Sequence, residues 1–142
     1  MTNNSPPASL CFYLYASARR MVQRYTAALK PHNLTYTQYI VLKTLAESDD
    51  ITVSELGERL FLDTGTLTPV LKKLEERTLL NRTRQKSDER VVLLAITSEG
   101  RELAKEIAPD VEGLCGCCGL EPDERETVSK LLAKMLQNFS CK

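Results

Sequence analysis

Cysteine thiols are the side chains of this 142-residue sequence with the most distinctive chemistry to offer. Five are present: Cys11, Cys115, Cys117, Cys118 and Cys141. Their number is odd and the polar N-terminus lacks a signal-peptide pattern, so we do not expect a static disulfide framework. Three of the five lie within four residues, and such clustering indicates either thiol redox chemistry or metal binding.

Cys11 is expected in the first turn of a helix over about residues 9–30, with Ser9 as the N-cap. Unpaired N–H groups and the positive end of the helix dipole stabilise a thiolate at such a position. Tyr15 lies one turn further on the same face and Tyr25 lies on the same helix, and their hydroxyls can donate hydrogen bonds to a thiolate. From these residues alone, a buried and inert cysteine on an apolar helix is the simpler interpretation.

The remaining cysteines could supply a second thiol to an oxidised Cys11, because a sulfenic acid condenses with a thiol to form a disulfide. The candidate partners are Cys115, Cys117 and Cys118. Zinc binding is the alternative, but zinc-binding pairs usually have two to four residues between them. Here one residue or none separates neighbours, and the only histidine, His32, is expected on the surface after Pro31. We therefore expect no metal and no cofactor.

The bulk composition is that of an ordinary soluble domain, with 42% hydrophobic and 27% charged residues. The longest apolar run, residues 91–96, is too short to cross a membrane, and we expect a cytoplasmic protein. A net charge of zero counts mildly against nucleic-acid binding, but the charge is unevenly spread. Residues 1–46 carry five bases and no acid, whereas residues 98–126 carry nine acids and three bases.

Capping patterns and the spacing of apolar residues predict six helices and one β-hairpin. Three helices are expected over residues 9–30, 35–46 and 97–111. The other three are expected to begin at residues 52, 63 and 122. The strands are expected at residues 80–85 and 91–96, on either side of a charged turn. This order predicts a mainly α fold with a small β-hairpin wing, a winged helix-turn-helix, in a single domain over residues 1–142.

Within that domain, residues 35–97 are expected to form the winged helix-turn-helix module. The flanking segments, residues 9–30 and 98–142, carry apolar stripes that no other predicted layer covers. We interpret these terminal helices as a homodimer interface. The alternative is that they pack on the core of their own chain.

A helix-turn-helix places its second helix in the major groove of DNA, so the helix that begins at Asp63 is the candidate reader. Its candidate DNA-binding residues are Thr64, Thr66, Thr68, Pro69, Lys72 and Lys73. Those of the hairpin are Arg82, Arg84, Lys86, Asp88 and Arg90. A long cation on the hairpin could enter the minor groove, and Asp88 could orient the Arg90 guanidinium by a bidentate pair. The alternative is an ordinary solvated surface.

Four segments resemble a known family. LTYTQYIVL (34–42), ELGERLFLDTGTLTPVLKKLEERTLL (55–80) and SDERVVLLAITSEG (87–100) are similar to the MarR family of winged-helix repressors. LCFYLY (10–15) is similar to its organic-hydroperoxide-sensing branch, the OhrR-type regulators. The resemblance covers about residues 9–100, and more loosely the last helices.

The resemblance implies a homodimer that binds a pseudo-palindromic operator in double-stranded DNA. It implies a repressor that leaves the operator when an organic hydroperoxide oxidises Cys11. Tyr15 and Tyr25 would contact the thiol from the partner subunit, and Arg90 would enter the minor groove with the support of Asp88. Some members of the branch have a resolving cysteine between their last two helices, but the register of the cluster cannot be carried over.

Three other functions stay open at this point. A MarR-like repressor could respond to a small phenolic ligand, in which case Cys11 would be redox-inert. A thiol peroxidase shares the thiol chemistry, but nothing in the sequence encodes a thioredoxin-like fold or a CxxC motif on a βαβ unit. A zinc-binding regulator would need the cysteine cluster, whose spacing is unsuitable.

Overall fold

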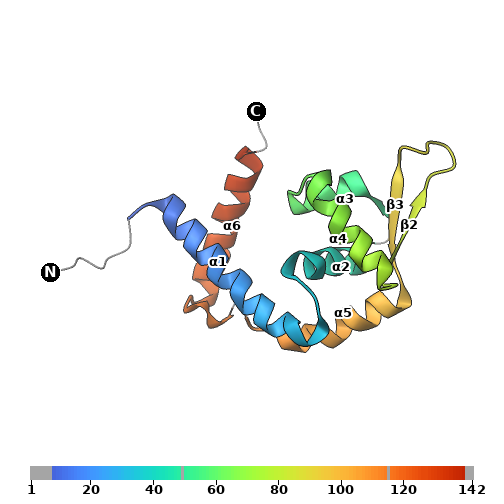
Figure 1. Cartoon of the computed structure of the whole chain (residues 1–142). Coiled ribbons are helices and arrows are strands. Elements are labelled where there is room, and N and C mark those ends of the chain that lie inside the picture. Colours follow the sequence, from blue (N-terminus) through green and yellow to red (C-terminus); the bar gives the residue numbers. More distant parts are fainter. Residues whose placement is uncertain (1–7, 49, 115, 140–142) are drawn as a thin grey trace. The chain divides into compact units, whose positions relative to one another are not determined.

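The computed structural model describes residues 8–48, 50–114 and 116–139 (Figure 1). The chain divides into two compact units, residues 1–112 and 113–142. The elements are α1 (Leu10–Leu29), η1 (Lys30–His32), α2 (Tyr36–Glu47), β1 (Ile51–Thr52), α3 (Val53–Leu60), α4 (Thr64–Glu76), β2 (Leu80–Arg84), β3 (Val92–Ile96), α5 (Ser98–Val111), η2 (Gly116–Cys118) and α6 (Pro122–Phe139). The mainly helical fold with a small hairpin is confirmed.

The helix starts expected from the sequence are confirmed by their caps. Ser9 Oγ accepts a hydrogen bond from the Phe12 N–H at 3.2 Å, and both threonine capping boxes, at α2 and α3, are formed. Asp63 and Thr97 cap α4 and α5 in the same way. These side chains satisfy N–H groups that the helix itself leaves unpaired, which is why the sequence marks the boundaries so clearly.

The sheet has three antiparallel strands in the order β1-β3-β2. The expected hairpin is confirmed, with Leu80 opposite Ile96 and Arg84 opposite Val92. The other edge of β3 pairs with β1, where Ile51 lies opposite Leu94. The sequence did not predict β1, because two residues are too few to show an alternating pattern.

The core of the first unit is formed by side chains of the sheet and of helices that precede and follow its strands in the sequence. Its fully buried side chains are Leu29, Val41, Leu42, Leu45, Leu56, Leu67, Leu71, Leu74, Leu80, Leu94 and Ile107. Gly100 allows the start of α5 to lie against the α4–β2 connection, since a Cβ there would be 2.2 Å from the Leu79 carbonyl oxygen. The helix-turn-helix is thus held on a closed apolar core.

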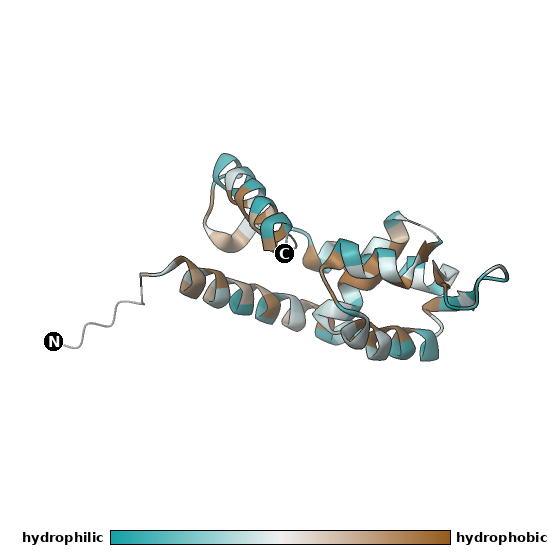
Figure 2. Cartoon of the chain, turned by 90° about the horizontal axis from the view of Figure 1, so that it is seen from above, coloured by the Kyte–Doolittle hydropathy of each residue, from teal (hydrophilic) through white to brown (hydrophobic). Residues whose placement is uncertain are grey.

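The apolar residues of α6 and of the first half of α1 are not buried in this way. Figure 2 shows hydrophobic residues recurring along both helices. Leu10 is 63% exposed, Leu131 57% and Phe139 72%. Over the described residues, no helix is long and apolar enough to span a membrane.

Candidate functional site

The turn between α3 and α4 is tight and has a defined cause. Phe61 adopts a left-handed conformation (φ 53°), and the Leu62 N–H donates to the Gly57 carbonyl at 2.9 Å. A Cβ at Gly57 would lie 2.7 Å from the Leu62 carbonyl oxygen, so only glycine permits this approach. The turn therefore fixes the angle at which α4 leaves α3.

The first turn of α4 is organised by Asp63. Its carboxylate accepts hydrogen bonds from the Thr66 N–H at 2.7 Å and the Thr66 hydroxyl at 3.1 Å. These bonds, the backbone one first, hold the pKa of Asp63 below its ordinary value. Pro69 lies inside the helix, and the residue four before it is Gly65, which adds no side chain to the crowding that proline causes there.

The six residues expected to face DNA from α4 are all exposed: Thr64, Thr66, Thr68, Pro69, Lys72 and Lys73. The structure thus brings them onto the surface of one helix, with hydroxyls in its first two turns and amines further along. The Thr68 hydroxyl donates to the Thr64 carbonyl at 2.7 Å. Its oxygen remains an acceptor, so it can still bind a donor on a base edge.

The loop between β2 and β3 carries the exposed side chains of Lys86, Asp88 and Arg90. The expected pair between Asp88 and the Arg90 guanidinium is wrong in its atoms: Asp88 Oδ1 accepts from the Arg90 backbone N–H at 3.0 Å. An aspartate two residues before an N–H closes this local turn readily. Arg84 donates from its guanidinium to the Glu89 carbonyl at 2.9 Å and so braces the loop.

Arg82 is engaged within the chain. Its Nε and Nη2 donate to one Glu75 carboxylate oxygen at 2.8 and 2.5 Å, and both side chains are about one-third exposed. The hydrogen bonds from Arg82 lower the pKa of Glu75. Because Glu75 belongs to α4, this pair ties the first wing strand to the helix of the helix-turn-helix. Sequence reasoning had placed Arg82 with the DNA-facing cations.

Cys11 has an exposed thiol in the first turn of α1, directly after the Ser9 cap, and no acidic residue lies in that turn. Tyr15, one turn later, is 61% exposed and lies under the Arg19 guanidinium, 5.5 Å from ring centroid to carbon. Tyr25 packs instead against Tyr36, with ring centroids 4.9 Å apart. Fourteen residues along one helix separate its backbone from that of Cys11 by about 21 Å. Tyr25 therefore cannot reach the thiol of its own chain.

The cysteine cluster belongs to the second unit. Cys117 and Cys118 lie exposed in the short helix η2. Cys115 and Cys141 lie outside the described residues. Across the ranges that the structure describes, no group of three or more histidine, cysteine, aspartate or glutamate side chains could hold a metal ion.

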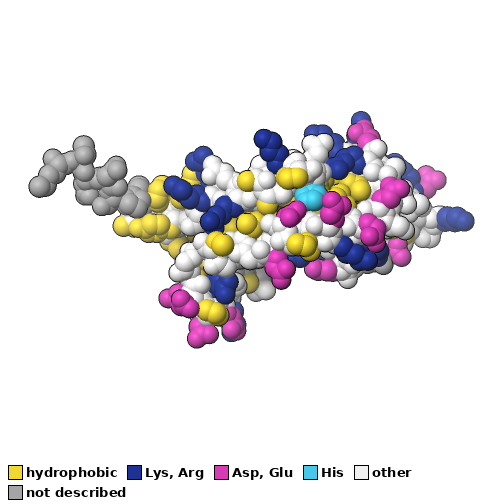
Figure 3. Space-filling view, turned by 90° about the horizontal axis from the view of Figure 1, so that it is seen from below, with side chains coloured by type: hydrophobic (Ala, Val, Ile, Leu, Met, Phe, Trp, Pro, Cys, Tyr) yellow, Lys and Arg dark blue, Asp and Glu magenta, His cyan; other side chains and the backbone are white. Residues whose placement is uncertain are grey.

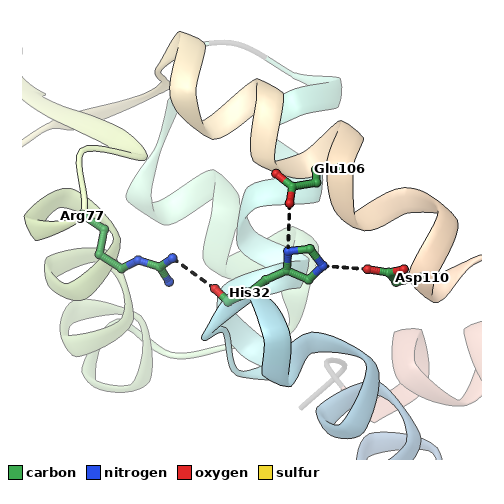
Figure 4. Close-up of polar contacts among 4 residues, drawn as sticks. All are labelled: His32, Arg77, Glu106 and Asp110. Carbon is green, nitrogen blue, oxygen red and sulfur yellow. Dashed lines mark hydrogen bonds and ion pairs between the residues drawn. The ribbon is translucent and has the colours of Figure 1, made fainter.

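His32 was expected on the surface, and that expectation is wrong. Its side chain is only 9% exposed and lies between two carboxylates of α5 (Figure 4). Nε2 is 2.7 Å from Asp110 Oδ2, and Nδ1 is 3.7 Å from Glu106 Oε1. The only histidine of the chain, cyan in Figure 3, accordingly lies among acidic side chains. The one available signal was the spacing of Glu106 and Asp110, which places both on one face of a helix.

A family model for "Transcriptional regulator SarA/Rot" matches residues 23–107. The organic hydroperoxide resistance transcriptional regulator of Bacillus subtilis (strain 168) is 44% identical over 122 residues, which are 86% of this chain and 81% of that protein. This relative confirms the resemblance to the hydroperoxide-sensing branch that the sequence motifs indicated.

Solved structures agree with the sequence comparison. Reduced AbfR bound to DNA, a protein of Staphylococcus epidermidis, superposes with a TM-score of 0.78 at 35% identity over 92% of this chain and 91% of AbfR. Its disulfide form gives a TM-score of 0.68 at 33% identity, over 89% of each chain. A MarR variant from E. coli complexed with operator DNA gives 0.81 at 27% identity, over 89% and 93%. The chain therefore belongs to the SarA/Rot family of transcriptional regulators, with the winged-helix fold of the MarR-like proteins.

Proposed function

We propose that this regulator is a redox-sensing repressor: a homodimer that binds a pseudo-palindromic operator and leaves it when an organic hydroperoxide oxidises Cys11. The observation that carries the proposal is the placement of Cys11. Its exposed thiol occupies a capped, acid-free helix N-terminus in a chain that also presents a helix-turn-helix and a wing. A function on chromosomal DNA would accompany a cytoplasmic location.

The DNA-binding part of the proposal assigns α4 to the major groove and the wing to the minor groove. Thr64, Thr66, Thr68 and Pro69 would meet base edges, while Lys72 and Lys73 would contact phosphates. On the wing, Lys86 and Arg90 would contact DNA, with Arg84 and Asp88 shaping the loop that presents them. The DNA-bound structures of AbfR and MarR support this assignment by fold.

The dimer is supported by the uncovered apolar side chains of α1 and α6. Burying a leucine removes it from water with a gain of about 1.5–3 kcal/mol, so a helix with several exposed leucines is expected to associate. The position of Tyr25 is a second argument. Because it lies too far along α1 to meet Cys11 of its own chain, the contact implied by the resemblance requires a partner subunit.

The chemistry begins with attack of the Cys11 thiolate on a hydroperoxide oxygen. The sulfur becomes a sulfenic acid, the O–O bond breaks, and the organic fragment leaves as an alcohol after protonation. A thiol of the partner's cluster then attacks the sulfenic sulfur, which releases water and forms an intersubunit disulfide. The disulfide form of AbfR supports such a state. The thiol is consumed once per signal, so no catalytic turnover is expected.

The test is a measurement of operator affinity on the protein's own upstream DNA, before and after one equivalent of cumene hydroperoxide, and again after dithiothreitol. Wild-type protein should lose affinity and regain it. The Cys11→Ser variant should bind normally and ignore the peroxide, and Cys141→Ser, outside the proposed site, should behave as wild type. Release of the Cys11→Ser variant at the same dose would place the sensor elsewhere and contradict the proposal.

A second candidate is control by a small anionic or phenolic ligand. A hollow of about 460 Å³ in the first unit favours it. It is lined by Thr26, Lys30, Asn33, Leu34, Thr35, Gln38, Lys73, Glu76 and Arg77. Ligand control requires that salicylate bind the Cys11→Ser variant, as measured by calorimetric titration, and that this binding lower the operator affinity of the variant. Redox control through Cys11 requires neither result, so the two measurements separate the candidates.

A further inference from the structure

The short turn that links α1 to α2 is held from two sides by groups far away in the sequence. η1 occupies Lys30–His32, and Asn33 follows in a left-handed conformation (φ 55°). The Asn33 N–H closes the turn on the Lys30 carbonyl at 3.0 Å. The turn therefore has a defined structure. It contacts the rest of the unit in two ways, through the side chain of His32 and through backbone carbonyl groups.

The first group of bonds reaches α5. The His32 imidazole lies against Asp110 Oδ2 at 2.7 Å and Glu106 Oε1 at 3.7 Å, with 9% of the side chain exposed. The two carboxylates are themselves exposed on α5, so they can hold the imidazole without the cost of burying their own charge.

The second group of bonds reaches α4. Arg77, the C-cap residue of that helix, donates from Nη1 to the Asn33 carbonyl at 2.8 Å and from Nη2 to the His32 carbonyl at 3.1 Å. Figure 4 shows the guanidinium and the two α5 carboxylates meeting at this one turn. A planar guanidinium that donates to two adjacent carbonyl oxygens fixes both the distance and the orientation between its own helix and the turn. The end of the helix that would read DNA is thus tied to the end of α1.

From these contacts we infer that the turn Lys30–Asn33 is the joint through which α1 and α5 set the orientation of α4, with His32 and Arg77 as positioning residues. The inference rests on the proposed function, because it supplies the route from thiol to DNA. α1 is a single helix of about 30 Å with Cys11 at one end and this joint at the other. If α1 moves as a rigid helix, a displacement of its Cys11 end rotates its other end, which is connected to the joint.

The experiment measures operator affinity of the reduced and the peroxide-oxidised full-length protein by fluorescence anisotropy. His32→Ala should weaken binding by the reduced form about threefold to tenfold and reduce the oxidised-to-reduced difference by the same factor. His32→Gln should restore most of the affinity, because its amide can still donate to Asp110. Lys105→Ala is the matched control, since that amine pairs with Glu102 on α5 itself and makes no bond to the joint.

A double-mutant cycle separates positioning from mere stability. His32→Ala and Asp110→Ala should each weaken operator binding, and together they should weaken it no more than either alone. Unchanged reduced-state affinity of both single variants would overturn the joint. So would additive losses that follow the melting temperature and are not rescued by glutamine. A wild-type protein that kept its operator after Cys11 oxidation would instead contradict the proposed function, while the reduced-state cycle would still decide the joint.

Discussion

The helix-turn-helix module and the terminal helices use apolar residues in opposite ways. In the module, Leu67, Leu71 and Leu74 of α4 are fully buried within the chain, and polar groups cover the outside. In α6, Leu131 and Leu136 remain 57% and 43% exposed, and the first half of α1 is similar. One region is complete as a single chain, whereas the other has apolar surface that a further layer must cover. Under the proposed function, the first region reads DNA and the second forms the dimer.

The same leucine truncation in the two regions should have different consequences. Leu71→Ala removes a side chain that is 1% exposed, so it should lower the free energy of unfolding by about 2–5 kcal/mol at any protein concentration. Leu131→Ala should matter only through the dimer, so its effect on urea unfolding should depend on concentration. If Leu131→Ala lowered the free energy of unfolding equally at all protein concentrations, α6 would pack on its own chain. That result would contradict the distinction between the two regions.

A charge on the exposed face of α6 is the sharper test of assembly. Leu132→Glu should dissociate the dimer, because a carboxylate would be desolvated without a partner in an apolar interface. Sedimentation equilibrium reports the change as a loss of the dimer mass. Lys134→Glu alters charge on the same helix away from the apolar stripe, and it should sediment as wild type does. A dimer that survived Leu132→Glu intact would remove α6 from the interface.

Two arginines of the hairpin should separate binding from folding. Arg90→Ala should weaken operator binding about tenfold and flatten its salt dependence, without a change in melting temperature. Arg82→Ala should mainly lower the free energy of unfolding, by less than about 1 kcal/mol because the pair with Glu75 is partly exposed. Filter binding across a salt series and thermal melts give both quantities. If the two variants lost operator affinity equally, Arg82 would be a DNA-contacting residue like Arg90.

The smallest expected effect is an acid-dependent loss of stability in the module. Hydrogen bonds from Thr52, Thr66 and Arg82 hold the pKa values of Glu55, Asp63 and Glu75, respectively, below their ordinary values. The unfolded chain therefore binds protons more readily, and this stabilisation, complete at neutral pH, is lost as the pH falls through the lowered values. Urea midpoints measured from pH 7 down to about pH 3 should fall less steeply for Asp63→Asn, whose amide cannot titrate.

Local signals predicted most of the fold. The caps of α1 to α5, the hairpin and the proline start of α6 each depend on residues within a few positions of one another, and all are confirmed. β1 was missed because its partner Leu94 lies far along the chain, and two residues carry no period of their own.

The candidate site was less predictable wherever a side chain had a choice of partners. Asp88 was paired with a guanidinium, yet the nearer backbone N–H of Arg90 takes its carboxylate. Arg82 was grouped with its neighbours on the hairpin, yet Glu75, seven residues earlier, is within reach only once β2 folds beside α4. His32 has partners 74 and 78 positions away, Glu106 and Asp110. Sequence spacing reveals contacts inside an element and conceals those between elements.

The length of α1 gives the proposed sensor a property of its own. Since Cys11 and Tyr25 of one chain are about 21 Å apart, each proposed sensing site would combine the thiol of one subunit with the tyrosine of the other. A mixed dimer of Cys11→Ser and Tyr25→Phe chains would therefore keep one complete site, although neither parent homodimer has any. Complementation between two defective subunits becomes a measure of dimer geometry. Dilution below the dissociation constant should, in turn, silence peroxide sensing and operator occupancy at the same concentration.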